Sequence, residues 1–211
     1  IWTEPGFAIG QRALLVESPA GNILWDCISL VDSATVSAVQ ERGGLAAIAI
    51  SHPHFYGAMV EWSRAFGGIP IYVHADDRRW VMRHDPAIVY WGGDAHAIAR
   101  GFTLVRCGGH FEGSSVLHWA GGAGGAGAIL AGDTLMVTRD RRWVSFMYSY
   151  PNYIPLAPGA VRQIVSALEP YRFEQIYGGW HGQNILSDGR AVLRRSAERY
   201  LQAISAATLS A

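Results

Sequence analysis

Five polar side chains in this sequence stand where an apolar run ends and a glycine-containing or polar loop begins. His52 and His54 follow one such run in Ile-Ser-His-Pro-His, and His110, Asp133 and His181 follow later runs with glycine nearby. Two loop histidines at positions i and i+2 can turn toward one point, and imidazole and carboxylate are ligands for zinc and other first-row metals. Taken singly, each residue is more often a hydrogen-bonded structural or turn residue. Together, at the starts of successive loops, they favour a metal site.

Short apolar runs separated by glycine, proline and polar clusters would position these residues. Strands are predicted at residues 11–17, 23–28, 45–50, 71–73, 102–107, 115–119, 128–130, 135–138 and 173–177. Helices are predicted at residues 33–42, 59–66, 76–82, 158–168 and 189–204. The glycine-rich residues 121–127 are expected to connect two strands, because neither a helix nor a lysine follows them as in a phosphate-binding loop. Two sheets with helices on each predict an α/β fold, a four-layer αββα sandwich formed by a single domain over residues 1–211.

The composition excludes several classes of function. The 211 residues carry 17 basic and 17 acidic side chains, so no charge excess favours nucleic acid or an anionic membrane as a partner. All of the basic residues are arginine, which excludes a lysine Schiff base. No apolar run approaches the roughly 20 residues of a membrane helix. Cys27 and Cys107 lie in predicted strands and are expected to be reduced core residues.

A small-molecule substrate is the expected partner, and self-association into a homo-oligomer is left open. Because the sequence begins with Ile1 rather than methionine, an upstream segment is expected to be missing. A cytoplasmic location is the default expectation.

Four motifs follow one another in a fixed order along the chain. They are His-Pro-His at 52–54, Gly-His-Phe-Glu-Gly-Ser at 109–114, Gly-Asp-Thr at 132–134 and the glycine-flanked His181. This order resembles the metallo-β-lactamase superfamily, with its HxHxDH, GHTxGS and GDTL segments, over most of the chain. The segment around Asp26 corresponds to an early strand end of that family. The resemblance implies a metallo-β-lactamase-type αββα sandwich and a metal-dependent hydrolase.

The sequence departs from the family pattern in the loop that supplies a second metal ion. Tyr56 and Gly57 stand where the family has aspartate and histidine. Tyrosine is a poor zinc ligand because its phenol keeps its proton to about pH 10, and glycine has no side chain. A second site would retain only His181 and a shared Asp133, below the three protein ligands typical of catalytic zinc. The expected ligands of a single ion are His52, His54, His110 and Asp133, with His181 as a weak fifth.

Further roles follow from the resemblance and from this departure. Asp133 or a metal-free His181 could take up the proton of an attacking water, since imidazole suits acid–base chemistry near neutral pH. Tyr56 could donate a hydrogen bond to a developing oxyanion, or form an aromatic wall in the vacated site. Asp26 is expected to orient a ligand histidine or the loop backbone.

Aromatic side chains concentrate between residues 143 and 153. Core packing is the default expectation for them, and a pocket wall for an apolar or aromatic substrate is the alternative. These residues are Trp143, Phe146, Tyr148, Tyr150 and Tyr153.

Three functions are compatible with the sequence. The first is a hydrolase with one divalent metal ion, expected to be zinc with iron or manganese as alternatives, that attacks an ester, thioester or lactone. The second is a non-haem iron oxidoreductase that resembles the sulfur dioxygenases, with His52, His110 and Asp133 on the iron. The third is a catalytically degenerate binding protein that keeps the fold, which Tyr56 and Gly57 motivate.

Overall fold

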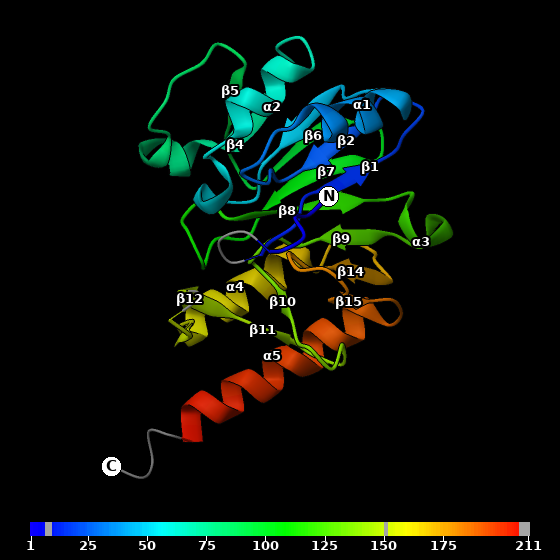
Figure 1. Cartoon of the computed structure of the whole chain (residues 1–211). Helices are drawn as coiled ribbons and strands as arrows, with labels where there is room; N and C mark the ends of the chain where they lie inside the picture. Colours follow the sequence, from blue (N-terminus) through cyan, green and yellow to red (C-terminus); the bar gives the residue numbers. More distant parts are fainter. Residues whose placement is uncertain (7–9, 150–151, 207–211) are drawn as a thin grey trace.

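The computed structural model describes residues 1–6, 10–149 and 152–206. The first of its two main sheets lies in the N-terminal half of the chain (Figure 1). Its strands, in spatial order, are β1 (Leu14–Val16), β2 (Ile23–Trp25), β3 (Ala47–Ala49), β4 (Ile71–His74) and β5 (Ile88–Trp91). β1 pairs antiparallel with β2, and β2 to β5 run parallel. The loops that follow β2 and β3 therefore leave the sheet at the same edge.

The second sheet has six strands in the order β15-β14-β9-β8-β7-β6. In chain order they are β6 (Ala95–Ala99), β7 (Phe102–Arg106), β8 (Ser115–Trp119), β9 (Ala128–Leu130), β14 (Gln175–Tyr177) and β15 (Asn184–Ile185). β7 and β9 are both antiparallel to β8, and β14 is parallel to β9. The loops after β7, β9 and β14 consequently share one edge of this sheet.

Helices cover the outer face of each sheet (Figure 1). α1 (Ser33–Glu41) and α2 (Met59–Ala65) lie on the first sheet, and α4 (Pro158–Leu168) and α5 (Gly189–Ala206) lie on the second. Between the sheets pack Trp25, Leu104, Leu117 and Leu130. The two outer core clusters include Ile48, Trp62 and Ile71 on one side, and Ile129, Ile164 and Leu193 on the other. This αββα sandwich confirms the predicted fold class.

Shorter elements connect these layers. They are η1 (Pro53–Phe55), η2 (Ala75–Trp80), α3 (Gly122–Gly125), β10 (Met136–Val137), β11 (Val144–Ser145), β12 (Met147–Ser149) and β13 (Ile154–Pro155). α3 joins the antiparallel strands β8 and β9, as expected for the glycine-rich connection. Among the described residues, none of the helices combines the length and apolar character needed to cross a membrane.

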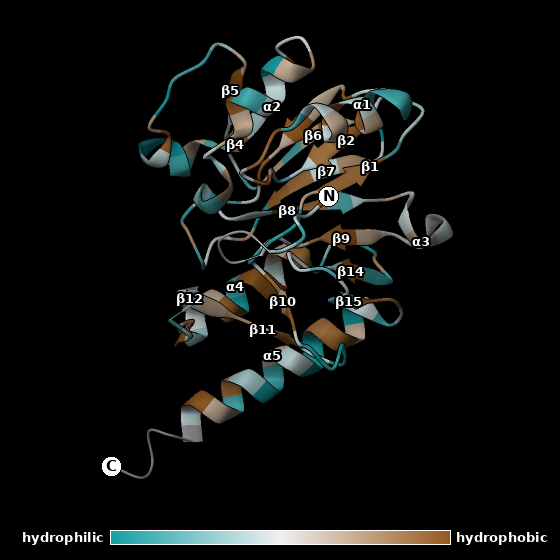
Figure 2. Cartoon of the chain, viewed as in Figure 1, coloured by the Kyte–Doolittle hydropathy of each residue, from teal (hydrophilic) through white to brown (hydrophobic). Residues whose placement is uncertain are grey.

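Several predicted elements match the structure. α1 begins after Asp32, whose carboxylate accepts a hydrogen bond from the Thr35 amide at 2.9 Å. α4 has the predicted bounds, because its apolar residues recur on one face. β5 and β6 were not predicted, although the four residues of β5, Ile88–Trp91, form a continuous apolar run. In Figure 2 central strands such as β2, β7 and β9 are hydrophobic, as are parts of α4 and α5. Cys27 and Cys107 are free and buried, as expected.

Candidate metal centre

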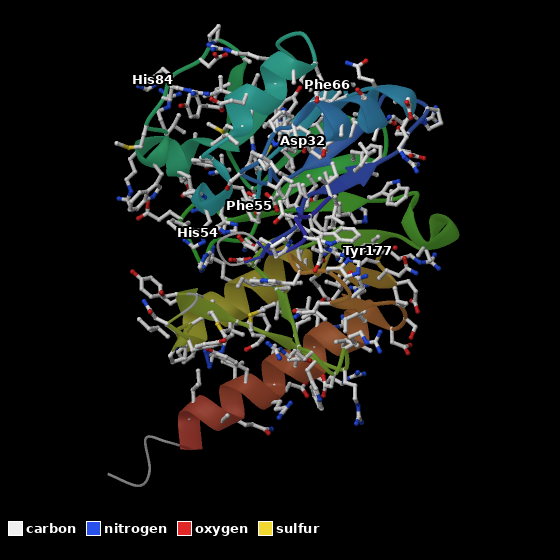
Figure 3. All side chains as sticks on the ribbon, viewed as in Figure 1. Asp32, His54, Phe55, Phe66, His84 and Tyr177 are labelled. Atoms are coloured by element: carbon white, nitrogen blue, oxygen red, sulfur yellow. The ribbon has the colours of Figure 1, made fainter. Side chains whose placement is uncertain are left out.

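His52 and His54 enter the site from the loop after β3. His52 has an extended backbone, with φ −170° and ψ 170°, and Pro53 then begins η1. After this sharp change of direction the His54 ring lies 4.8 Å from that of His52. Figure 3 shows His54 between the upper and lower halves of the molecule. His52 is 1% exposed, whereas the side chain of His54 is 35% exposed. One ligand is therefore sealed in the protein and the other faces its surface.

His110 and Asp133 come from the same edge of the second sheet. The loop after β7 turns at Gly108 and Gly109, which have φ of 67° and 89°. A side chain at Gly109 would come within 3.0 Å of Leu156, so glycine is required for this close approach. Asp133 follows β9 after Gly132, which also has a positive φ of 52°. The glycines that precede His110 and Asp133 thus allow both residues to lie at the edge of the sheet where β7 and β9 end.

The four side chains converge on one point. Oδ2 of Asp133 lies 3.4 Å from Nε2 of His52, 3.8 Å from Nδ1 of His54 and 3.7 Å from Nε2 of His110. One ligand atom from each residue lies within 4.8 Å of the others. Ligands about 2.1 Å from a tetrahedral zinc ion would lie ~3.4 Å apart. The spacing in the protein is close to that of a single four-coordinate ion.

Two buried atoms of this group lack hydrogen-bond partners. Nε2 of His52 and Oδ2 of Asp133 are both enclosed, and neither makes a hydrogen bond among the described residues. A buried polar atom left in this state costs about 1–3 kcal/mol. A cation placed between them would satisfy both atoms, so the residues present fit a bound metal ion.

Three of the four ligands contact a residue outside the cluster. Nδ1 of His110 donates a hydrogen bond to the Met147 carbonyl oxygen at 3.2 Å, which leaves Nε2 unprotonated and able to bind a metal. Nδ1 of His52 lies 2.7 Å from Oγ of Ser51. The Gln11 side-chain amide donates to Oδ1 of Asp133 at 2.7 Å. These contacts fix the orientation of three of the four ligands.

Asp26 acts on the loop that carries His52. Its carboxylate accepts a hydrogen bond from the Ser51 amide at 2.7 Å. It is 1% exposed, and burial raises its pKa to about 8 despite the hydrogen bonds from Ser51. Of the two expected contacts, a ligand histidine or the loop backbone, the structure shows the second, at the residue before His52.

The protonation states of the ligands suit metal binding. Burial alone would raise the pKa of Asp133, but the neighbouring His52, His54 and His110 outweigh it and hold that pKa below its usual value. Burial lowers the pKa of His52, and it lowers the pKa of His110 to about 4. At neutral pH Asp133 is thus a carboxylate beside the neutral imidazoles of His52 and His110, the form that coordinates a cation.

Two of the predicted residues are not part of this cluster. His181 is exposed in the turn after β14, where its ring lies 4.2 Å from that of Trp2, and it is not in the group of converging ligands. Tyr56 packs against the apolar cluster on the outer face of the first sheet, and burial raises its pKa. Tyr56 therefore packs with the core of the first sheet, and it is not among the residues that line the cavity beside the ligands. A Cβ at Gly57 would meet no atom within 4 Å.

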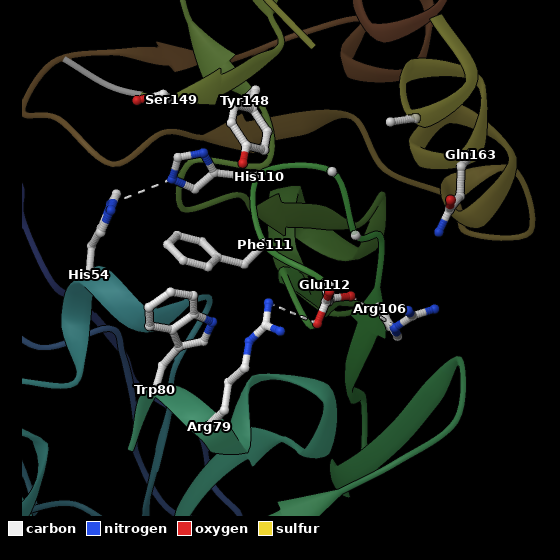
Figure 4. Close-up of a pocket in the computed structure, with 13 residues that line it drawn as sticks. His54, Arg79, Trp80, Arg106, His110, Phe111, Glu112, Tyr148, Ser149 and Gln163 are labelled. Atoms are coloured by element: carbon white, nitrogen blue, oxygen red, sulfur yellow. Dashed lines mark hydrogen bonds and ion pairs between the residues drawn. The ribbon is translucent and has the colours of Figure 1, made fainter. Parts of the chain in front are cut away.

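A cavity of about 510 Å³ opens beside His54 and His110. Figure 4 shows these histidines on one side of it, and Arg106 and Gln163 on the other. Its aromatic residues are Trp80, Phe111 and Tyr148. Trp80 and Phe111 were missed by the sequence analysis, although Phe111 is adjacent to a predicted ligand. Their rings lie 5.6 Å apart and edge to face, so they form one side of the cavity.

The other predicted aromatic residues have different places. Phe146 is fully buried against Tyr200, and Trp143 lies under the Arg199 guanidinium at 4.5 Å. Tyr153 is 64% exposed. Tyr150 lies outside the described residues. Tyr148 alone of the described members lines the cavity beside the metal ligands.

Asp77 joins η2, which forms part of the cavity wall, to the loop that carries His110. Its Oδ1 accepts a hydrogen bond from the Gly113 amide at 2.9 Å, while its buried Oδ2 lacks a partner among the described residues. A side chain at position 113 would come within 2.8 Å of Asp77. Burial raises the Asp77 pKa to about 6. Sequence analysis missed this residue, because its partner lies 36 positions away.

The raised pKa of Asp77 should make stability depend on pH. Between about pH 4 and about pH 6 the folded protein keeps a proton that the unfolded chain has released, so the free energy of unfolding falls as the pH rises. Asp77→Asn removes this proton and should flatten the decline, measured by urea unfolding across that range. Asp94→Asn, at an exposed position, is the control and should keep the wild-type slope. Equal slopes in all three proteins would contradict the assignment.

The comparisons with known proteins agree with this architecture. No protein-family model matches the chain. It is 44% identical over 205 residues to the uncharacterized protein YmaE of Bacillus subtilis (strain 168), covering 97% of this chain and 74% of YmaE.

Two similar solved structures are described as a metallo-β-lactamase and as a di-iron-bound protein. DIM-1 metallo-β-lactamase superposes with a TM-score of 0.69 at 15% identity, over 92% of this chain and 87% of that one. TTHA1623 in a di-iron-bound form gives 0.62 at 21% identity, over 90% and 95%. The chain therefore has the metallo-β-lactamase fold and belongs to the family of YmaE.

Proposed function

We propose that this protein is a metal-dependent hydrolase with one divalent ion, zinc, held by three histidines and Asp133. The observation that carries the proposal is the convergence of four ligand atoms within 4.8 Å, two of them buried without hydrogen-bond partners. The position of His181 outside this group supports one ion rather than two. The substrate is a small molecule with an ester, thioester or lactone bond.

The residues around the cluster divide the work of binding and positioning. When held by these residues, zinc would lower the pKa of a bound water to about 7 and would polarise a substrate carbonyl. His54 and His110 line the cavity, so a substrate there meets the cluster from their side. Trp80 and Phe111 form an apolar wall that excludes water from the bound substrate. Of the two expected proton acceptors, Asp133 lies in the cluster and His181 does not.

A second candidate is a non-haem iron oxidoreductase. The likeness to TTHA1623, described in a di-iron-bound form, is the observation that favours it. Two histidines and one carboxylate with open positions are a ligand set used by iron oxygenases. Oxygen consumption by the iron-loaded protein, with no hydrolysis by the zinc-loaded protein, would select this candidate.

The proposed hydrolase is tested by reconstitution. Protein stripped with a chelator is loaded separately with zinc, iron and manganese, and its metal content is measured by elemental analysis. Each form is then assayed on a panel of esters, thioesters, lactones and phosphodiesters. We expect about one ion per chain and hydrolysis of a carbonyl substrate that disappears in the stripped protein. A metal content near zero in every form, or hydrolysis that survives stripping, would overturn the proposal.

A further inference from the structure

Backbone and side-chain hydrogen bonds hold Gln11 and Arg12 beside the metal cluster. Gln11 forms an antiparallel bridge with Trp180, and the Arg12 amide donates to the Gly179 carbonyl oxygen at 2.8 Å. The guanidinium of Arg12, which is 8% exposed, donates to the Gly178 carbonyl oxygen and to Oδ1 of Asn184. These contacts fix the backbone at Gln11 without using the Gln11 side chain.

The Gln11 side chain is therefore free to act on Asp133. Its amide nitrogen donates to Oδ1 of Asp133 at 2.7 Å. A Cβ at Gly179 would lie 3.4 Å from this oxygen and 3.9 Å from the Gln11 amide nitrogen, so the two groups meet beside a position that has no side chain. The amide is a neutral donor, and it holds the carboxylate in place without competing for the cation.

The two oxygens of Asp133 consequently have different environments. Oδ2 lies among His52, His54 and His110 without a hydrogen bond, and Oδ1 receives the hydrogen bond from Gln11. A carboxylate that is free to rotate could offer either oxygen, or both, to a cation. With Oδ1 engaged by a donor, only Oδ2 is directed at the ion, so the carboxylate acts as a ligand through one oxygen.

We propose that Gln11 is a positioning residue for the metal site: its amide holds Asp133 so that Oδ2 alone faces the ion. The inference rests on the proposed metal centre. It adds Gln11, from the beginning of the sequence, as a residue that acts on the ligand Asp133 rather than on the ion. Hydrogen-bond partners of metal ligands typically change metal affinity about 10–100-fold when they are removed.

The test compares Gln11→Leu, which keeps most of the side-chain volume without a donor, with Gln11→Ala. Gln40→Ala, on the exposed side of α1, is the matched control. Zinc Kd is measured by competition with a chromophoric chelator, and the unfolding midpoint of each stripped protein is measured in urea. We expect both Gln11 variants to bind zinc about 10–100-fold more weakly than the wild type, and Gln40→Ala to match the wild type.

The outcomes separate this inference from the proposed function. A wild type that binds zinc, with Gln11 variants of unchanged Kd and a lower urea midpoint, would make Gln11 a purely structural residue and overturn the inference alone. A wild type that binds no zinc would overturn the proposed function, and the inference with it. Weaker zinc binding by both variants while they remain folded supports the inference.

Discussion

Replacing His110 by alanine is expected to weaken zinc binding by more than about 100-fold, because loss of a ligand should exceed the effect of losing a ligand's hydrogen-bond partner. His110 contributes Nε2 to the cluster, 3.7 Å from Oδ2 of Asp133 and 3.5 Å from Nδ1 of His54. Its removal leaves two histidines, His52 and His54, around Oδ2 of Asp133. Hydrolysis at subsaturating metal should fall by a similar factor, measured together with metal content by elemental analysis.

His84→Ala is the matched control for this prediction, since His84 is exposed and is not among the cluster residues. It should retain the metal content and the rate of the wild type. Full metal binding by His110→Ala would show that the four converging side chains are not the ligands and that the metal binds elsewhere in the protein.

Replacing Trp62 by alanine is expected to lower the free energy of unfolding by about 3–5 kcal/mol, the range found when a large aromatic side chain is removed from a core. Trp62 is 0% exposed in the cluster between α2 and the first sheet. Its indole nitrogen donates to the Ile28 carbonyl oxygen at 2.9 Å, so the variant loses a buried hydrogen bond as well as the packing. Urea unfolding of the stripped protein measures the change.

Trp80→Ala provides the contrast within the same residue type. Trp80 is 44% exposed and lines the cavity beside His54, so its removal should change stability by less than about 1 kcal/mol. It should instead raise KM for any substrate that the zinc-loaded protein hydrolyses. A loss of less than about 1 kcal/mol in both variants would mean that Trp62 is not a principal core residue.

The layers of the fold could be predicted because they depend on local patterns. α1 and α4 are specified by a capping aspartate and by an apolar face, both of which are visible within a few residues. β5 was missed, although Ile88–Trp91 is a continuous apolar run of the kind that predicted other strands. Its residues alternate only weakly in burial, and Val89 is 38% exposed. The strand forms because it pairs in parallel with β4, which is a contact between distant parts of the chain.

The same distinction applies to the metal site. His52, His54, His110 and Asp133 follow strands of the two sheets and converge in the structure. Their positions at strand ends suggested a metal site, and the resemblance to the metallo-β-lactamase superfamily grouped them as the ligands of one ion. His181, predicted as a weak fifth ligand, lies outside this group, and its ring is tilted against that of Trp2, 179 positions earlier. Gln11 and Trp80 reach the site through tertiary contacts, and no local signal marks either residue.

The four ligands also join the two halves of the sandwich. His52 and His54 belong to a loop of the first sheet, and His110 and Asp133 belong to loops of the second. An ion bound there would act as a cross-brace, and its binding energy would add to the cohesion of the whole protein. At a free metal concentration about 100 times the Kd, this linkage amounts to about 2.7 kcal/mol. The thermal tolerance of the protein would then follow the metal supply of its surroundings.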